Sequence, residues 1–170
     1  MTSIEEELDI IIENLIAIDA LYNMRIILLA DELEGEEIKE IVEKAKIYNI
    51  ITETKFEGIK EEMELCISPQ GMTREYINKK INSEYGYSLN INNYTFKENT
   101  KIAIIGTESR IGTTTMAMNI ASYLEEMGAG VSYTEANANN HLRVIHSVFF
   151  NEILIQDNYF RGNGIDYFFN

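Results

Sequence analysis

The sequence contains no tryptophan, one proline and one cysteine among its 170 residues. The lone Cys66 cannot form an intramolecular disulfide, which favours a reducing, cytoplasmic environment. No apolar run reaches the roughly 18 residues that a membrane-spanning helix needs. The acidic start, MTSIEEELDI, also lacks the basic region of a secretory signal. We therefore expect a soluble cytoplasmic protein without a membrane span.

Basic residues are scarce, with 14 Lys and Arg against 28 Asp and Glu and a net charge of -14. A broad nucleic-acid-binding surface requires clustered Lys and Arg, so we expect no nucleic-acid partner. Residues 1–99 hold 10 Lys and Arg against 21 Asp and Glu, a net charge of -11, whereas residues 100–170 hold 4 against 7, a net charge of -3. This uneven charge indicates two parts with different surroundings.

The first 85 residues combine helical and strand patterns. Apolar residues recur at helical spacing over residues 4–22, behind a capping-box pattern formed by Ser3 and Glu6. Further along, apolar runs of strand length alternate with amphipathic segments. The predicted elements are strands at 24–31 and 49–52 and helices at 34–48, 55–67 and 73–86. This order predicts parallel βα units and hence an α/β fold.

Three features of this region have two interpretations each. The acidic side of the first helix is interpreted as a solvated face, with a functional acidic patch as the alternative; its members are Glu5, Glu6, Asp9 and Glu13. Asp31 follows an apolar strand, as a phosphoacceptor would, but a helix N-cap is the favoured interpretation. Cys66 lies between Leu65 and Ile67, which favours a buried structural thiol over a reactive one.

Residues 86–99, GYSLNINNYTFKEN, have no helical period, and we expect them to link two domains. Beyond them, TKIAIIG predicts a buried strand at 101–105 and a loop that begins at Gly106. A helix over 113–127 and a strand over 129–135 follow, separated by a glycine. This strand–loop–helix–strand unit is the best-defined pattern in the chain.

The remaining residues carry weaker signals. We expect a helix over 141–158 and a final strand, GIDYFF, over 164–169. An alternative interpretation makes ILIQD a strand whose terminal Asp157 would hold a metal ion. His141 and His146 have no cysteine or carboxylate at metal-ligand spacing, so we expect no metal site at these histidines.

The loop between the strand and the helix has the composition of a phosphate cradle. Backbone N–H groups of such a loop, together with the positive end of the helix that follows, favour anions. A nucleotide-binding loop also supplies a Lys for the phosphates and a Ser or Thr hydroxyl for Mg²⁺. Here Thr114 stands at the metal-ligand position and Thr113 at the lysine position. A capped helix beneath an empty loop is the structural alternative.

The segment 101–137, KIAIIGTESRIGTTTMAMNIASYLEEMGAGVSYTEAN, resembles the first βαβ unit of the deviant P-loop ATPases of the ParA/MinD group. Four residues match the family's apolar, Gly, Thr and Thr positions, namely Ile111, Gly112, Thr114 and Thr115. The resemblance implies a P-loop-type unit with a partial parallel sheet, and makes residues 100–170 the N-terminal half of such a domain. It implies a site for ATP or ADP formed by Arg110, Ile111, Gly112, Thr113, Thr114 and Thr115, with Thr114 as the Mg²⁺ ligand.

The chain departs from the family at the charged positions of the loop. Glu108 and Thr113 replace the two lysines, and Ser109 and Arg110 replace two glycines. The strand end carries Glu135 where the family has an Asp-x-Asp-like pattern. A carboxylate at Glu108 would repel a triphosphate, while Arg110 offers a substitute positive charge. We therefore expect weak nucleotide binding or none, and no catalytic residue.

The order of the two regions resembles the architecture of pilus-assembly proteins of the TadZ/CpaE type, which join a receiver-like domain to a ParA/MinD-like domain. The chain departs from that architecture before residue 24, where it has one helix at 4–22 in place of an earlier βαβ stretch. Residues 24–67 resemble the later βα units of a receiver, so residues 1–85 are interpreted as an acidic receiver-like region. The chain stops before the distal strand and switch segments of such ATPases. It is accordingly either a piece of a longer protein or a shortened relative.

This resemblance implies a degenerate ParA/MinD-like protein that acts as a scaffold or localisation partner in pilus or secretion assembly. Its expected partners are proteins, and a homodimer is one of them. A low-rate Mg-ATP-dependent NTPase, in which Arg110 replaces the lysine, is one alternative. An acidic protein–protein interaction module without nucleotide is the other.

Overall fold

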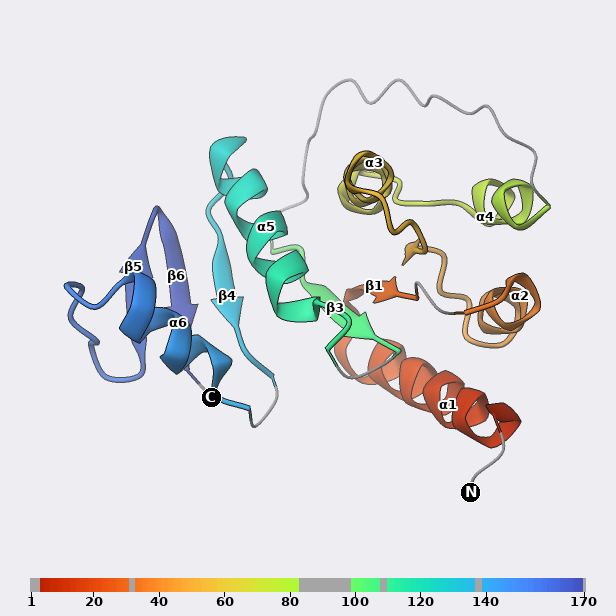
Figure 1. Ribbon diagram of the computed structural model, residues 1–170, viewed down its shortest axis with the longest axis horizontal. Coiled ribbons are helices and arrows are strands. Elements are labelled where there is room, and N and C mark those ends of the chain that lie inside the picture. The colour runs from red at the N-terminus through yellow and green to blue at the C-terminus, as the bar shows by residue number, and fades with distance from the viewer. Residues whose placement is uncertain (1–3, 31–32, 83–98, 108–109, 137–138, 170) are drawn as a thin grey trace. The chain divides into compact units, whose positions relative to one another are not determined.

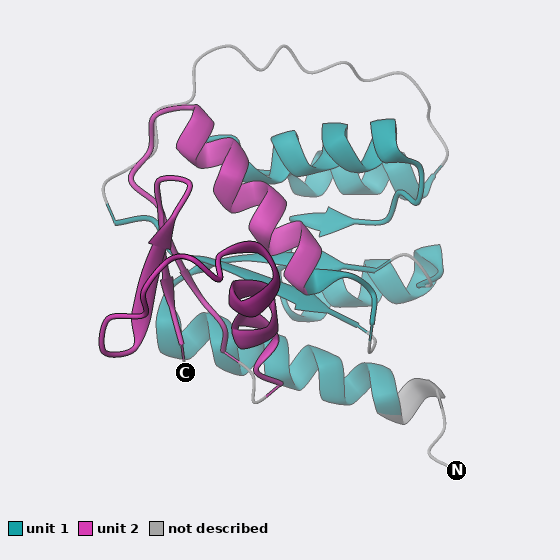
Figure 2. Ribbon diagram, turned by 60° about the vertical axis from the view of Figure 1, so that its left-hand side comes forward, with its two compact units in different colours: residues 1–113 teal, residues 114–170 magenta. Residues whose placement is uncertain are grey.

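Helices and strands alternate along most of the chain in the computed structural model, which describes residues 4–30, 33–82, 99–107, 110–136 and 139–169 (Figure 1). The chain divides into two compact units, residues 1–113 and 114–170 (Figure 2). The predicted α/β class with a parallel sheet is confirmed. Within the described ranges, no helix is both long and apolar enough to span a membrane.

The first unit is built around a parallel three-stranded sheet with the strand order β2-β1-β3. Its elements are α1 (Ile4–Tyr22), β1 (Arg25–Leu29), α2 (Gly35–Lys44), β2 (Ile50–Ile51), α3 (Phe56–Ile67), α4 (Arg74–Ile81) and β3 (Ile102–Gly106). The central strand β1 is buried from Ile26 to Leu29. Its apolar run suits this position because helices cover a parallel sheet on both faces, with α1 and α3 on opposite sides (Figures 1 and 2).

The helices of the first unit bury the apolar stripes that their spacing predicts. The stripe of α1 consists of Leu8, Ile12 and Leu15, and that of α2 consists of Ile38, Ile41 and Val42. The predicted range of the first helix is confirmed, whereas α4 ends at Ile81 and not at Gly86. Its end coincides with Asn82, whose backbone N–H donates to the carbonyl of Asn78; Gly86 lies outside the described residues.

The second unit combines two helices with a mixed sheet of order β4-β6-β5. Its elements are α5 (Thr113–Glu126), whose first residue belongs to the first unit, β4 (Ser132–Thr134), α6 (His141–Phe149), β5 (Tyr159–Gly162) and β6 (Ile165–Phe168). The core is largely aromatic and contains Ala121, Leu142, Phe160, Ile165, Tyr167 and Phe169. As predicted, α5 stops before Gly128, which has a φ of 86°.

Two predictions for the end of the chain are corrected. The helix expected over 141–158 ends at Phe149, because Phe150 and Ile153 turn toward the aromatic core. Strand β5, which was not predicted, pairs antiparallel with the predicted final strand. Asn163 and Gly164 connect the two strands, and their φ angles of 48° and 79° are those that a tight hairpin turn needs.

Strand β3 has a different position from the one that the sequence analysis assigned to it. We expected β3 in a second domain with residues 100–170, but β3 pairs with β1 of the first unit over five residues, from Ile102 to Gly106. Strand β4 belongs to the other sheet, so the strands on either side of α5 do not pair with each other. Of the expected linker 86–99, only Asn99 is among the described residues.

Candidate functional site

The loop that follows β3 carries the candidate phosphate-binding residues of the first unit. The end of the strand is held against β1, because both the backbone N–H and the hydroxyl of Thr107 donate to the carbonyl of Leu29, at 3.2 and 3.3 Å. Arg110 is exposed, with a left-handed φ of 70°. Gly112 has a φ of 96° and open space where a Cβ would lie. Glu108 lies outside the described residues.

Thr114, the predicted Mg²⁺ ligand, belongs to the second unit and contacts a histidine. Its Oγ1 lies 3.4 Å from Nδ1 of His141, the first residue of α6. The neighbouring Thr115 is exposed, and Thr113 is half-buried. The hydroxyl at the metal-ligand position therefore has a hydrogen-bond partner within its own unit. This contact was not predicted, because His141 lies 27 residues further along the chain.

Glu135, at the end of β4, caps helix α6. Its carboxylate is 6% exposed and accepts hydrogen bonds from the backbone N–H groups of His141 and Leu142, both at 3.0 Å. A carboxylate suits this place because a helix N-terminus carries unpaired N–H groups and partial positive charge. The N-cap residue Asn140 makes no such side-chain bond. Burial, and then the negative charge of Glu135, raise the pKa of Tyr133.

Thr114, His141 and Glu135 thus form a connected cluster, but its geometry is not that of a hydrolase triad. Nδ1 of His141 faces both the Thr114 hydroxyl and Oε1 of Glu135, at 3.4 and 3.7 Å. A relay through imidazole needs the hydroxyl and the carboxylate on different ring nitrogens. The arrangement places the Thr114 hydroxyl, the His141 ring and the Glu135 carboxylate around the start of α6.

The alternative metal-binding interpretation of Asp157 is wrong. Residues 153–157 form no strand, and Asp157 is exposed in a turn with a φ of 52°. Backbone hydrogen bonds between Gln156 and Tyr159, at 2.8 and 2.9 Å, close that turn. Asp31 lies outside the described residues, and the N-cap of α2 is Glu34, whose N–H donates to Glu37 at 2.7 Å.

The two histidines have separate structural surroundings. Nε2 of His146 lies 2.8 Å from the carbonyl oxygen of Ile153, and its ring meets Phe160 edge to face at 4.6 Å. His146 therefore holds the chain after α6 against the core, while His141 faces Thr114. Over the described part of the chain, no three metal-ligating side chains lie together. Cys66 is fully buried, as predicted, and burial raises the pKa of its thiol.

The first unit contains an ion pair between Glu62 and Lys80 that was not predicted from the sequence. Glu62 is 2% exposed, and its Oε2 accepts from the N–H groups of Thr52 and Glu53 at 2.9 and 3.0 Å. Its Oε1 pairs with Lys80 of α4. Burial lowers the pKa of Lys80, and the charge of Glu53 opposes that shift. The pair joins α3 and α4 to the end of β2. The sequence signal for its burial is the position of Glu62 on the same helical stripe as the apolar Leu65 and Cys66.

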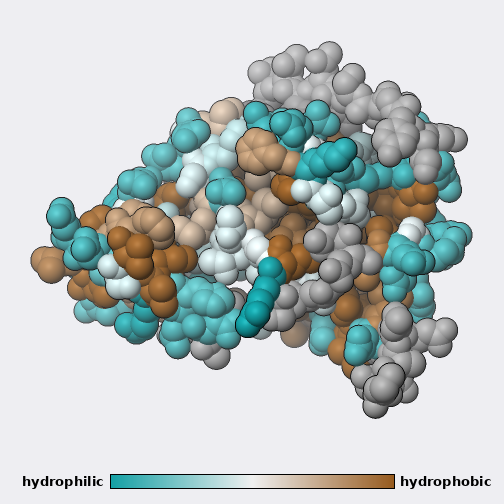
Figure 3. Space-filling model, viewed as in Figure 1, coloured by the Kyte–Doolittle hydropathy of each residue, from teal (hydrophilic) through white to brown (hydrophobic). Residues whose placement is uncertain are grey.

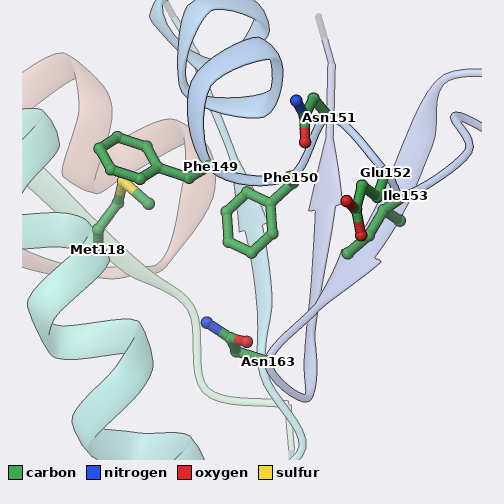
Figure 4. A pocket seen from close by; sticks show the side chains of 7 residues that line it. All are labelled: Met118, Phe149, Phe150, Asn151, Glu152, Ile153 and Asn163. Carbon is green, nitrogen blue, oxygen red and sulfur yellow. The ribbon is translucent and has the colours of Figure 1, made fainter.

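The second unit also contains a pocket of about 630 Å³. It is lined by Met118, Phe149, Phe150, Asn151, Glu152, Ile153 and Asn163. Figure 4 shows the Phe150 ring between Phe149 on one side and Glu152 on the other. Large apolar side chains therefore form most of the lining, and one carboxylate and two amides supply its polar groups. The pocket was not predictable from the helix expected over 141–158, because it forms where the chain turns after α6 ends at Phe149.

Comparisons with protein-family models, with curated proteins and with solved structures gave no match to this chain. The likeness to the ParA/MinD group therefore rests on the residues of the loop and the helix that follows.

Proposed function

We propose that this protein is a degenerate relative of the ParA/MinD group that works as a scaffold or localisation partner in the cytoplasm. In this proposal it binds nucleotide weakly or not at all and catalyses no hydrolysis. The main support for this proposal is the contact between Thr114 and His141, because it engages the hydroxyl that would otherwise ligate Mg²⁺. Pilus or secretion assembly is the setting that the resemblance suggests.

The charged groups around this contact support the same proposal. Glu135 is bound to two backbone N–H groups of α6, so its carboxylate is committed to the helix terminus. Thr113 stands where a nucleotide-binding loop has its phosphate-binding lysine. Losing that lysine removes the charge-assisted hydrogen bonds that hold the terminal phosphates.

Exposed apolar side chains favour a protein partner. The second unit exposes Val144, Val148, Phe149, Leu154 and Ile155 to between 44% and 82%. Figure 3 shows hydrophobic residues at the surface of the region that contains α6, β5 and β6. Apolar surface of this kind is typical of protein–protein contact sites. A second copy of the chain and an unrelated protein are both partners that it can accept.

The alternative NTPase function rests on Arg110, whose exposed side chain is the cation of the loop. Phosphate release at millimolar Mg-ATP separates the two functions, with Gly112→Val as the inactive control. The proposed scaffold releases phosphate no faster than the control. Turnover that disappears in both Arg110→Ala and Thr114→Ala would establish the NTPase and overturn the proposal.

A further inference from the structure

We propose that the pocket of the second unit binds an arginine side chain presented by a basic segment of a protein partner. This inference names the partner chemistry for the proposed scaffold and to that extent rests on the proposed function. The pocket lies wholly within residues 118–163 and is separate from the loop after β3. Its volume of about 630 Å³ accommodates a guanidinium together with apolar neighbours of the arginine.

The aromatic side chains of the pocket offer a surface for a cation. Phe149 is 74% exposed, so its ring is accessible. The Phe150 ring is fixed behind it by Phe160 and Tyr167, with centroid distances of 5.3 and 5.7 Å. A planar guanidinium stacks favourably on such rings. The same unit contains an example of this contact, in which Arg143 lies 4.8 Å from the Phe169 ring centroid.

The polar side chains of the pocket favour a guanidinium over other groups. Glu152 is exposed and makes no ion pair with any described residue, so its charge is available to a ligand. Asn151 and Asn163 add amide oxygens that accept hydrogen bonds. Arginine carries five N–H donors in one plane, which one carboxylate and two amides can share. Residues 100–170 hold 4 Lys and Arg against 7 Asp and Glu, and this net charge of -3 favours a cationic ligand over an anionic one.

The residues beside the pocket indicate that the arginine belongs to a chain and is not a free molecule. Val148 precedes the lining segment and is 61% exposed, and Leu154 and Ile155 follow it at 82% and 44%. These side chains offer more apolar surface than one arginine can cover. Apolar residues on either side of the arginine in a partner segment would bury them.

The test is fluorescence anisotropy with a labelled short peptide that has one central arginine between leucines. Matched peptides replace the arginine with citrulline, which keeps the shape without the charge, or with lysine. The protein variants are Glu152→Gln and Phe149→Ala, both at exposed positions where folding tolerates the change. Glu126→Gln, on the exposed side of α5, is the matched charge control, and Met127→Ala is the matched apolar control.

We expect the arginine peptide to bind the wild type and both control variants equally. Glu152→Gln and Phe149→Ala should each weaken it about fivefold, as should citrulline, because each removes one ion-pair or cation–π contact. Equal binding of arginine and citrulline peptides, or binding indifferent to both variants, would overturn the inference. So would binding of free arginine amide as tight as that of the peptide. Phosphate release from Mg-ATP is measured separately, so ATP turnover would overturn the scaffold role and leave the pocket result standing.

Discussion

The two units differ in what they bury and in what they leave exposed. Among the described residues, the first unit has an aliphatic core apart from Cys66 and Met72, and the buried Glu62 pairs with the partly exposed Lys80 beside it. The second unit has about half as many residues, yet among the described residues it exposes six large apolar side chains, including Phe149 and Leu154, against five in the first unit. The first unit exposes Leu21 and Phe56 outside its aliphatic core, whereas the second exposes a run of apolar side chains near its pocket, from Val148 to Ile155. In our proposal the partner binds the second unit, and binding through the acidic N-terminal half is the alternative.

Removing the cation that pairs with Glu62 should destabilise the first unit, and this is the largest of the expected effects. Lys80→Met leaves the Glu62 carboxylate buried without its cation and should lower the free energy of unfolding by about 3 kcal/mol. Urea unfolding followed by labelling of Cys66, the only thiol, measures it. Lys79→Met is the control on the same helix, since its i,i+4 pair with Glu75 contributes less than about 1 kcal/mol. If the two variants lower the free energy of unfolding equally, the pair with Glu62 contributes no more than a surface ion pair.

The next effect tests the aromatic packing of the second unit. A Cβ at Gly162 would lie 2.6 Å from Cε1 of Phe150, so Gly162→Ala should displace that ring and cost about 2 kcal/mol. Near-ultraviolet circular dichroism of the tyrosines follows the unfolding. Gly130→Ala is the matched control, because nothing lies within 4 Å of its Cβ position. A Gly162→Ala protein as stable as the control would show that the ring has room to move.

A smaller effect tests the capping of α6 in the second unit. Glu135→Gln removes the charge that two backbone N–H groups share, and the loss should be about 1 kcal/mol. Urea unfolding of this variant beside Glu126→Gln, which is exposed, isolates the cap. If the two substitutions have the same effect, Glu135 does not hold the helix.

The stability of the first unit should depend weakly on alkaline pH because of the buried Cys66 thiol. Burial raises the pKa of the Cys66 thiol above that of a thiol in the unfolded chain, about 8.5. The stability that this burial contributes is therefore complete below about pH 8.5 and declines as the pH rises above it. Urea midpoints at neutral and alkaline pH should differ more in the wild type than in Cys66→Ala. An equal decline in the two proteins would assign the pH dependence to other groups.

Most elements with long, regular patterns were predictable, because one apolar stripe decides each of them. The first helix and the stop at Gly128 are examples. The hairpin of β5 and β6 was missed although Asn163-Gly164 is a strong turn signal, because the segment before it was assigned to a helix. Pairing of β3 with β1 depends on contacts between distant segments, which no local pattern specifies.

The candidate site was predictable only in part, for the same reason. The phosphate-binding role of Arg110 to Thr115 stays a prediction. In this loop, Arg110 and Gly112 have positive φ angles of 70° and 96°. The sequence did not reveal that Thr114 contacts His141 or that Glu135 caps α6, since both contacts join segments that are separated along the chain. The pocket depends on how residues 149–153 turn after α6, which side-chain packing decides.

Calorimetric titration with Mg-ATP measures whether the loop after β3 binds nucleotide, which the proposed scaffold does weakly or not at all. Gly112→Val is the control, because a side chain at a φ of 96° is strained and would disrupt the loop. We expect no saturable heat at millimolar Mg-ATP, or a weak heat that is alike in the wild type and Gly112→Val. Strong, saturable heat that the wild type gives and the variant lacks would contradict the proposal.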